Sequence, residues 1–300
     1  MLSILIPIYN YNCVELVREL HSQASKAEID FEILCIDDAS SLYKEENRII
    51  KSFSHCRYIE SETNLGRSKI RNLLAEEAKF NNLLFLDCDV EILHPDYIRT
   101  YLKYLEQYDI VSGRRVYSET PPLQKEYYFH WFYGVKRETK SKNFMSNNFF
   151  IKKSLWQFSK FNEDITLYGH EDTLFQVELE EKNIHIHFIA NPVVHAGLDS
   201  TEAFIVKTRE SVKNLMFLFD KKIITDRNID RFSLLKAYLR IRTFKVDKLL
   251  KCLFPIVKSA FEKNFSSRHP SLFLFDIYKL MYLSYISEKR ELSQSYFPVF

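Results

Sequence analysis

The stretch that most constrains the fold of this chain runs from Asn82 to Glu91. Its four consecutive apolar residues, 83–86, predict a short strand that is buried on both faces. The strand leads directly into Asp87 and Asp89, which are separated by one cysteine. Open α/β sheets bind ligands beyond the carboxyl ends of their strands, and two close carboxylates suit a hard cation such as Mg²⁺ or Mn²⁺. The structural alternative is that both acids only cap the helix that follows.

Short apolar runs alternate with helical segments over the first 113 residues, which predicts parallel βαβ units in an α/β fold. The predicted strands cover residues 2–10, 31–40, 57–60, 83–86 and 109–113, and the predicted helices cover 14–24, 43–52, 68–80 and 95–107. Polar residues end three of these strands, at positions 9–10, 37–38 and 87–89. Since parallel strands end at one edge of a sheet, we expect these residues to gather into one site.

Residues 114–200 extend the same region. An irregular, basic and aromatic stretch at 114–145 predicts a long loop, which in a compact domain is usually functional or disordered. A strand at 144–151, a short helix at 152–158 and a last strand at 184–190 are predicted around a loop at 164–175. Glu171 and Asp172 fall in the first turn of the helix that this loop opens, where the helix dipole favours acids.

The last hundred residues have a different character. Apolar residues recur there at helical spacing, with helices predicted at 203–219, 232–241, 248–261 and 272–286. This part holds 19 Lys and Arg against 10 Asp and Glu, whereas residues 1–200 hold 23 against 30. We therefore predict a catalytic domain at 1–200 and a helical region at 201–300. The basic helices predict either peripheral contact with an anionic membrane or packing on the catalytic domain with a solvated charged face.

The five cysteines are scattered and contain no Cys-x-x-Cys pair, which favours free thiols in a reducing compartment. No basic segment precedes the apolar run at 2–8, so no signal peptide is expected. No stretch reaches the roughly 18 uninterrupted apolar residues of a membrane span. These features predict a cytoplasmic protein, with the inner face of the membrane as a peripheral location. No nucleic-acid partner is expected, because no known reader motif occurs.

Five motifs in order resemble the family 2 glycosyltransferases, which have the GT-A fold. They are SILIPIYN at 3–10, CIDDAS at 35–40, NLGRS at 64–68 with Arg71 and Asn72, DCD at 87–89, and GHED at 169–172 with Phe175. The resemblance covers about residues 1–200. It implies a GT-A type, Rossmann-like, mostly parallel sheet flanked by helices. It also implies inverting, metal-dependent transfer of a sugar, usually from a UDP-sugar.

The resemblance assigns the nucleotide-sugar-binding residues one by one. Pro7 and Tyr9 match nucleoside contacts, and Asp38 matches the acid that hydrogen-bonds the uracil ring, while its neighbour Asp37 is expected to be a structural cap. The remaining positions, which match the diphosphate, ribose and sugar contacts, are Asn64, Gly66, Arg67, Arg71, Asp87 and Asn148, with Asn147 beside the last. Arg71 has a second interpretation as an ordinary residue of a helix surface.

The resemblance also assigns the metal and the chemistry. Asp89 is expected to bind Mn²⁺ or Mg²⁺, and His195 matches a third ligand that favours Mn²⁺; its alternative is a hydrogen-bonded loop residue. Asp172 is the expected catalytic base, because direct displacement needs one carboxylate to take the proton of the acceptor hydroxyl. Glu171 is expected to orient the acceptor. Both acids could instead cap the helix.

The predicted function is therefore an inverting glycosyltransferase of the hexosyltransferase type. It would move a sugar from a UDP-sugar to a saccharide or lipid-linked saccharide acceptor, in surface polysaccharide or glycolipid synthesis. Trp131 and Trp156 would either stack on a sugar or pack in the core. The alternatives are an inactive carbohydrate- or partner-binding protein on the same scaffold, and a nucleotidyltransferase. The latter ranks low because residues 7–10 carry no glycine, lysine or arginine.

Overall fold

The computed structural model describes residues 1–165 and 167–295, and these form two compact units. The first unit holds the described residues of Met1–Thr120, Gly134–Thr166 and Glu171–Gly197. The second holds those of Pro121–Tyr133, Leu167–His170 and Leu198–Phe300. Residues 296–300 of the predicted helical region lie outside the described residues.

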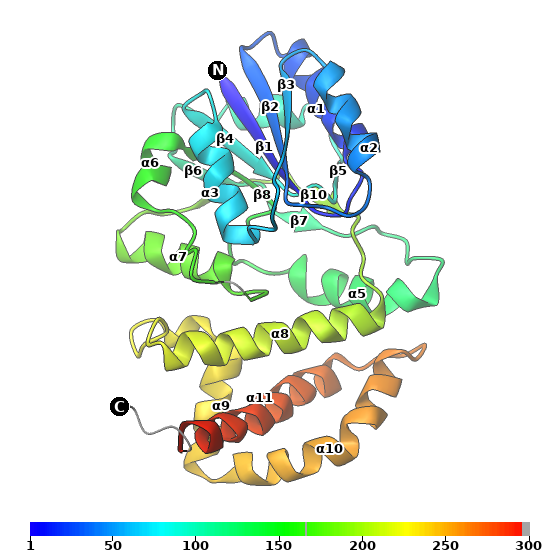
Figure 1. The fold of residues 1–300 in the computed structure, drawn as a ribbon, viewed down its shortest axis with the longest axis vertical. Helices are drawn as coiled ribbons and strands as arrows, with labels where there is room; N and C mark the ends of the chain where they lie inside the picture. Colours follow the sequence, from blue (N-terminus) through cyan, green and yellow to red (C-terminus); the bar gives the residue numbers. More distant parts are fainter. Residues whose placement is uncertain (166, 296–300) are drawn as a thin grey trace. The chain divides into compact units, whose positions relative to one another are not determined.

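A seven-stranded sheet forms the centre of the first unit (Figure 1). Its strand order is β3-β2-β1-β4-β8-β6-β9. The strands are β1 (Leu2–Ile8), β2 (Phe31–Asp37), β3 (Cys56–Glu60), β4 (Asn82–Leu86), β6 (Ile110–Ser112), β8 (Asn148–Lys152) and β9 (His187–Phe188). Strands β3, β2, β1 and β4 are parallel, whereas β8 runs antiparallel to both β4 and β6. The predicted α/β, mostly parallel sheet is confirmed.

Alternate side chains of each strand point to opposite faces, and both faces of this sheet are apolar. In β1, Ile4 and Ile6 join a core beneath α1 (Val14–Lys26) and α4 (Tyr97–Leu102), while Leu5 joins a second core. Helices α3 (Arg67–Glu77), α6 (Lys153–Phe158) and α7 (Glu171–Glu181) cover that second core. The remaining helical segments of this unit are α2 (Lys44–Asn47), the 3-10 turn η1 (Arg48–Ser52) and the π-helical turn η3 (Gly134–Glu138).

A second sheet of three strands escaped the sequence analysis. Strand β10 (Val193–His195) lies between β5 (Val90–Ile92), to which it is antiparallel, and β7 (Arg115–Val116), to which it is parallel. The expectation of an irregular loop over 114–145 is therefore wrong. That stretch contains β7, the 3-10 turn η2 (Lys125–Tyr127), α5 (Tyr128–Tyr133) and η3. Elements of two to six residues carry too few side chains to show a periodic pattern.

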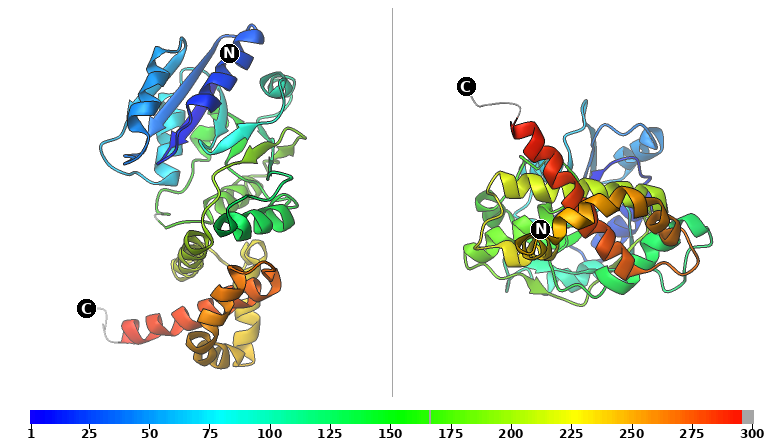
Figure 2. Two further views of the ribbon diagram at one scale, coloured as in Figure 1. Left: turned by 90° about the vertical axis from the view of Figure 1, so that its right-hand side faces the viewer. Right: turned by 90° about the horizontal axis from the view of Figure 1, so that it is seen from below.

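The second unit is helical where the structure describes it. Its long helices are α8 (Thr201–Asp220), α9 (Ser233–Thr243), α10 (Val246–Phe265) and α11 (Leu272–Ser295), with a 3-10 turn η4 (Ile229–Arg231) before α9. Ser200 caps α8, because its Oγ accepts a hydrogen bond from the Ala203 N–H at 3.2 Å. Helices α10 and α11 run side by side (Figures 1 and 2). None of the helices within residues 1–165 and 167–295 has both the length and the apolar character needed to cross a bilayer.

An aromatic cluster fills the second core of the first unit. The Trp156 ring stacks on Phe85 with the ring centres 4.8 Å apart, and it also contacts Phe149, Phe161 and Phe175. Trp156 is only 1% exposed. Of the two predicted roles for Trp156, core packing is the one that the structure supports.

We predict that Trp156→Ala lowers the free energy of unfolding by about 3–5 kcal/mol, because it leaves a large cavity among four aromatic rings. Phe158→Ala on the same helix is the matched control. Phe158 is 77% exposed, so its loss should change stability by no more than roughly 0.5 kcal/mol. Chemical denaturation of both variants measures the difference. Equal stabilities would show that the cluster does not hold this face of the sheet.

Candidate active site

Strand ends bring the candidate residues to one edge of the first unit. Strands β1 and β2 end in register, with Ile8 opposite Asp37. Strand β4 ends at Leu86, and the Asp87 N–H then donates to the Asn147 carbonyl at 3.2 Å, across from the start of β8. The polar residues that follow β1, β2 and β4 therefore lie at one edge of the sheet, as the sequence predicts.

Asp38 holds the turn that contains Asn64 and Gly66. Its Oδ1 accepts the Leu65 N–H at 2.6 Å, and its Oδ2 accepts the Gly66 N–H at 3.0 Å. Gly66 has a φ of +82°, which favours glycine, and α3 begins at the next residue. Burial raises the pKa of Asp38, and the two backbone N–H groups oppose that rise. Each carboxylate oxygen keeps a second lone pair, so a ring N–H of a base remains a possible further donor.

Asp37 is structural, as expected. It is fully buried, its Oδ1 accepts the Ser40 N–H at 2.8 Å, and its Oδ2 accepts the Tyr58 hydroxyl at 3.2 Å. Pro7 lies in β1 and is partly exposed, whereas Tyr9, just beyond that strand, is exposed. The Tyr9 ring is therefore accessible to a ligand at this edge.

Arg71 is not a residue of the helix surface. It is 3% exposed, and its Nη2 donates to Asp87 Oδ1 at 2.6 Å. The guanidinium also lies 5.6 Å from the centre of the Phe161 ring. Arg71 therefore orients Asp87, which leaves Arg67 as the accessible cation of this pair. The Arg67 side chain is 51% exposed, and its Nη1 lies 3.4 Å from Glu171 Oε1.

Asp89 and His195 come together at the small sheet. His195 Nδ1 lies 3.6 Å from Asp89 Oδ1, and the N–H groups of Ala196 and Gly197 donate to the Asp89 carbonyl. Burial would raise the pKa of Asp89, but the interactions of its carboxylate with His195, Arg67 and Arg115 lower it to about 2. Asp89 is therefore ionised at neutral pH.

The residues around Asp89 fit a divalent cation. Asp89 Oδ1 is buried and receives no hydrogen bond from the described residues. A Cβ at position 197 would collide with the Asp89 carboxylate, so only glycine leaves that carboxylate in place. Carboxylate oxygen and imidazole nitrogen together suit Mn²⁺. No group of three or more His, Cys, Asp or Glu side chains that could hold a metal occurs in the described parts of the chain. The protein thus offers two ligands, and an octahedral ion would need others from a diphosphate or water.

Glu171 and Asp172 begin α7. The Ser146 N–H donates to Asp172 Oδ2 at 3.1 Å, while Asp172 Oδ1 is buried and has no hydrogen-bond partner among the described residues. Burial and the neighbouring charge of Glu171 raise the pKa of Asp172 from 3.8 to about 6. A carboxylate with one unused oxygen and a raised pKa is suited to accept a proton.

The assignment of Asn148 to the donor site is wrong. Asn148 is fully buried, and its Oδ1 accepts the hydroxyls of Tyr97 and Tyr101 at 2.6 and 2.7 Å. Its Nδ2 donates to the carbonyls of Arg114 and Asn191 at 2.8 and 2.9 Å. All of its hydrogen-bonding groups are used inside the protein, so Asn148 joins the two sheets instead of facing a ligand.

Arg115 was missed by the sequence analysis. Its Nη2 lies 2.9 Å from Glu138 Oε2, and Glu138 also accepts a hydrogen bond from the Tyr117 hydroxyl. The Tyr117 ring packs edge-on against His195, with ring centres 5.4 Å apart. Burial opposes the charge of Arg115, but Glu138, Tyr117, Asp172 and Asp87 raise its pKa. The sequence signal was the pair Arg114 and Arg115, which follows β6. Only the small sheet, through β7, places the Arg115 side chain near these acidic residues.

Comparison with known proteins agrees with this geometry. The sequence profile of Glycosyl transferase family 2 matches residues 3–164. A curated relative from Haemophilus influenzae, described as an uncharacterized glycosyltransferase, is 35% identical over 108 residues. That alignment covers 36% of this chain and 35% of the relative, so the chain spans about a third of the relative's length.

Two solved structures share the fold. The mannosyltransferase PcManGT from Pyrobaculum calidifontis, in complex with GDP-Man and Mn²⁺, has a TM-score of 0.57 and 15% identity, covering 96% of this chain and 86% of that one. S. aureus TarS 1–349, in complex with UDP-GlcNAc, has a TM-score of 0.50 and 16% identity, covering 97% and 92%. At these identities the likeness establishes the GT-A fold alone. Because the family profile matches more than half of its residues, the chain belongs to glycosyl transferase family 2.

Proposed function

We propose that this glycosyltransferase moves a sugar, of the hexose class, from a UDP-sugar to an acceptor hydroxyl with inversion at the anomeric carbon. The observation that carries the proposal is the contrast between two carboxylates of the first unit. Asp89 has a pKa lowered to about 2, whereas Asp172 has a pKa raised to about 6. One acid is suited to binding a cation, and the other to accepting a proton.

The donor is proposed to bind at the strand ends. Tyr9 offers an exposed ring for the base, and Asp38, through the turn at Asn64 and Gly66, fixes the start of α3. Arg67 is the candidate for pairing with the diphosphate, because its side chain is the accessible one. Arg71 acts indirectly, by holding the Asp87 carboxylate for the ribose or for water around the cation.

Asp89 and His195 would hold Mn²⁺, or Mg²⁺ with weaker support from His195. The chemistry that the bound cation supplies is Lewis-acid stabilisation of the departing nucleoside diphosphate. Asp172 would take the acceptor proton through Oδ1 while the acceptor oxygen attacks the anomeric carbon. Glu171, at the same helix start, would orient the acceptor or Arg67.

Residues 1–200 are proposed as the nucleotide-sugar-binding catalytic domain, and 201–300 as an appended helical region. All of the proposed site residues fall in the first unit, whereas residues 121–133, 167–170 and 198–200 of the proposed catalytic domain belong to the second unit. The acceptor is proposed to be a saccharide or lipid-linked saccharide of surface polysaccharide or glycolipid synthesis. Exposed Leu249, Leu253 and Ile256 recur at helical spacing on α10, near exposed lysines, which supports peripheral contact with an anionic membrane.

We predict that Asp172→Asn keeps donor binding and loses transfer by about 100-fold or more, because the amide cannot accept the acceptor proton. In the unaltered protein, turnover should fall as the pH drops below about 6, where Asp172 becomes protonated. Steady-state turnover and donor binding, measured across pH 5–8, test both effects. Glu181→Gln, at an exposed site of the same helix, is the control and should retain turnover. Near-normal turnover of Asp172→Asn would remove Asp172 from the mechanism.

The same substitution should stabilise the fold at high pH. The folded-state pKa of Asp172 lies about two units above its ordinary value of 3.8. The ionised carboxylate therefore destabilises the protein at pH 8, by up to roughly 3 kcal/mol. This cost shrinks as the pH falls through 6 and vanishes below the unfolded pKa. Asp172→Asn should thus be more stable than the unaltered protein at pH 8 and closer to it at pH 5, as measured by chemical denaturation. A gap that widens at low pH would contradict the raised pKa.

Asp89→Ala and Gly197→Ala should both abolish Mn²⁺-dependent binding of the donor. The first removes a ligand, and the second introduces a methyl group where the Asp89 carboxylate lies. Thermal shift with UDP-, GDP-, dTDP- and CMP-sugars, each with and without Mn²⁺, measures this loss. A donor at 100 times its Kd should add about 2.7 kcal/mol to the stability of the unaltered protein.

Glu91→Gln, at the neighbouring exposed carboxylate of β5, should retain the Mn²⁺-dependent shift. If no nucleotide sugar shifts the unaltered protein, the transferase proposal fails in favour of an inactive binding protein. A shift only with GDP-, dTDP- or CMP-sugars would replace the UDP donor and leave the site intact.

A further inference from the structure

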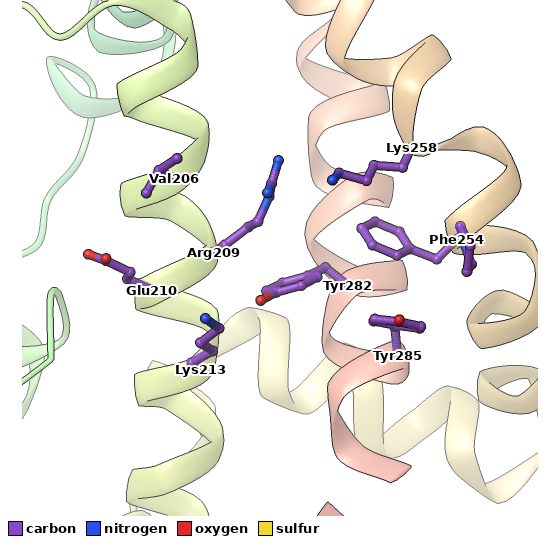
Figure 3. Close-up of a pocket in the computed structure, with 9 residues that line it drawn as sticks. Val206, Arg209, Glu210, Lys213, Phe254, Lys258, Tyr282 and Tyr285 are labelled. Carbon is purple, nitrogen blue, oxygen red and sulfur yellow. The ribbon is translucent and has the colours of Figure 1, made fainter. Parts of the chain in front are cut away.

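A pocket of about 360 Å³ lies within the second unit, between α8, α10 and α11 (Figure 3). Each helix contributes residues three or four positions apart to the lining, because residues at that spacing lie on one helix face. Its cationic and aromatic lining comprises Arg209 and Lys213 from α8, Phe254 and Lys258 from α10, and Tyr282 and Tyr285 from α11. No residue of the candidate active site takes part.

The lining carries an excess of positive charge. Three cationic side chains line the pocket against one carboxylate, that of Glu210. Figure 3 shows the charged ends of Arg209 and Lys258 directed towards each other across the pocket, while the Glu210 carboxylate points away to the other side of α8. An excess of cations around one space favours an anion there.

Arg209 is held in place by its own partners. Its Nε donates to the Tyr278 hydroxyl at 2.7 Å, and its Nη2 pairs with Glu262. Lys213 and Lys258, by contrast, make no ion pair with any carboxylate of the described residues. The two lysines therefore supply the positive charge of the pocket that no described carboxylate neutralises, whereas Arg209 links α8 to Glu262 of α10 and Tyr278 of α11.

Aromatic rings form the rest of the wall. Phe254 is buried, and its ring centre lies 5.5 Å from that of Tyr282 and 5.4 Å from that of Tyr285. Rings packed in this way present an apolar surface with polar edges. The pocket thus combines a cationic side with an apolar side, which suits an anion that carries an apolar substituent.

We propose that this pocket is a second ligand site, which binds a phosphate group with an apolar substituent through Lys213 and Lys258. Phosphate fits because its oxygens are strong acceptors for the charged donors of this lining. A phospholipid offers both parts of this chemistry, whereas a free phosphate offers the anion alone. The inference concerns the second unit alone and does not rest on the proposed transfer reaction.

The test uses the full chain in EDTA, which keeps any metal-dependent donor binding out of the measurement. Calorimetric titration with inorganic phosphate, with dihexanoyl phosphatidic acid and with dihexanoyl phosphatidylcholine compares the sources. We expect phosphatidic acid to bind, and the Lys213→Gln/Lys258→Gln pair to weaken that binding at least tenfold. Tighter binding of phosphatidic acid than of inorganic phosphate supports the apolar substituent, and equal or weaker binding of phosphatidic acid overturns it.

Lys248→Gln/Lys263→Gln is the matched control, because it removes two charges from exposed positions of α10 that do not line the pocket. Lys213→Arg/Lys258→Arg preserves the charge and should retain binding. The proposal is overturned if neither phosphate ligand binds, if phosphatidylcholine binds as well as phosphatidic acid, or if the control pair loses as much affinity as the pocket pair. Unfolding temperatures confirm that each variant is folded.

Discussion

The ion pair between Arg71 and Asp87 ties the start of α3 to the end of β4, and the geometry of the candidate active site depends on it. The guanidinium is almost fully buried, so the carboxylate that it faces is held in one position. Removing one partner of a buried pair typically costs 3–5 kcal/mol, because the other charge is left without compensation. Asp38 holds the same helix start from the other side, through the Leu65 and Gly66 N–H groups. Two carboxylates of the strand edge therefore hold the backbone around the candidate site in place.

The carboxylates of this edge have unequal surroundings, and this inequality separates their pKa values. Asp89 lies among His195, Arg67 and Arg115, whose interactions with the carboxylate outweigh the effect of its burial on the pKa. Asp172 is buried beside Glu171, and the positive charge of Arg71 does not compensate. A protein that needs an anion and a proton acceptor in one site obtains them from the same residue type by changing what surrounds each.

Much of this arrangement can be predicted from the sequence, and the failures have physical causes. The apolar run before Asp87 predicts β4, because a strand buried on both faces needs hydrophobic residues at every position. Asn148 was misassigned because the sequence does not show whether a polar side chain at a strand faces a ligand or accepts hydrogen bonds from two buried tyrosines. The small sheet was missed because strands of two or three residues are too short to show an alternation of apolar and polar residues. The burial of Arg71 depends on Asp87 and Phe161, which only the folded chain brings near.

The strand order of the large sheet has a consequence for synthesis on the ribosome. Strand β6 precedes β8 in the chain, yet β8 lies between β4 and β6 in the sheet. A nascent chain that has emerged as far as β6 can assemble the parallel half, β3 to β4, but β6 has no neighbour to join. Until β8 emerges, the free edge of β4 and the apolar side chains of β6 stay open to water and to other chains. The length of the segment between these two strands, residues 113–147, thus sets how long this edge stays unpaired as the chain emerges.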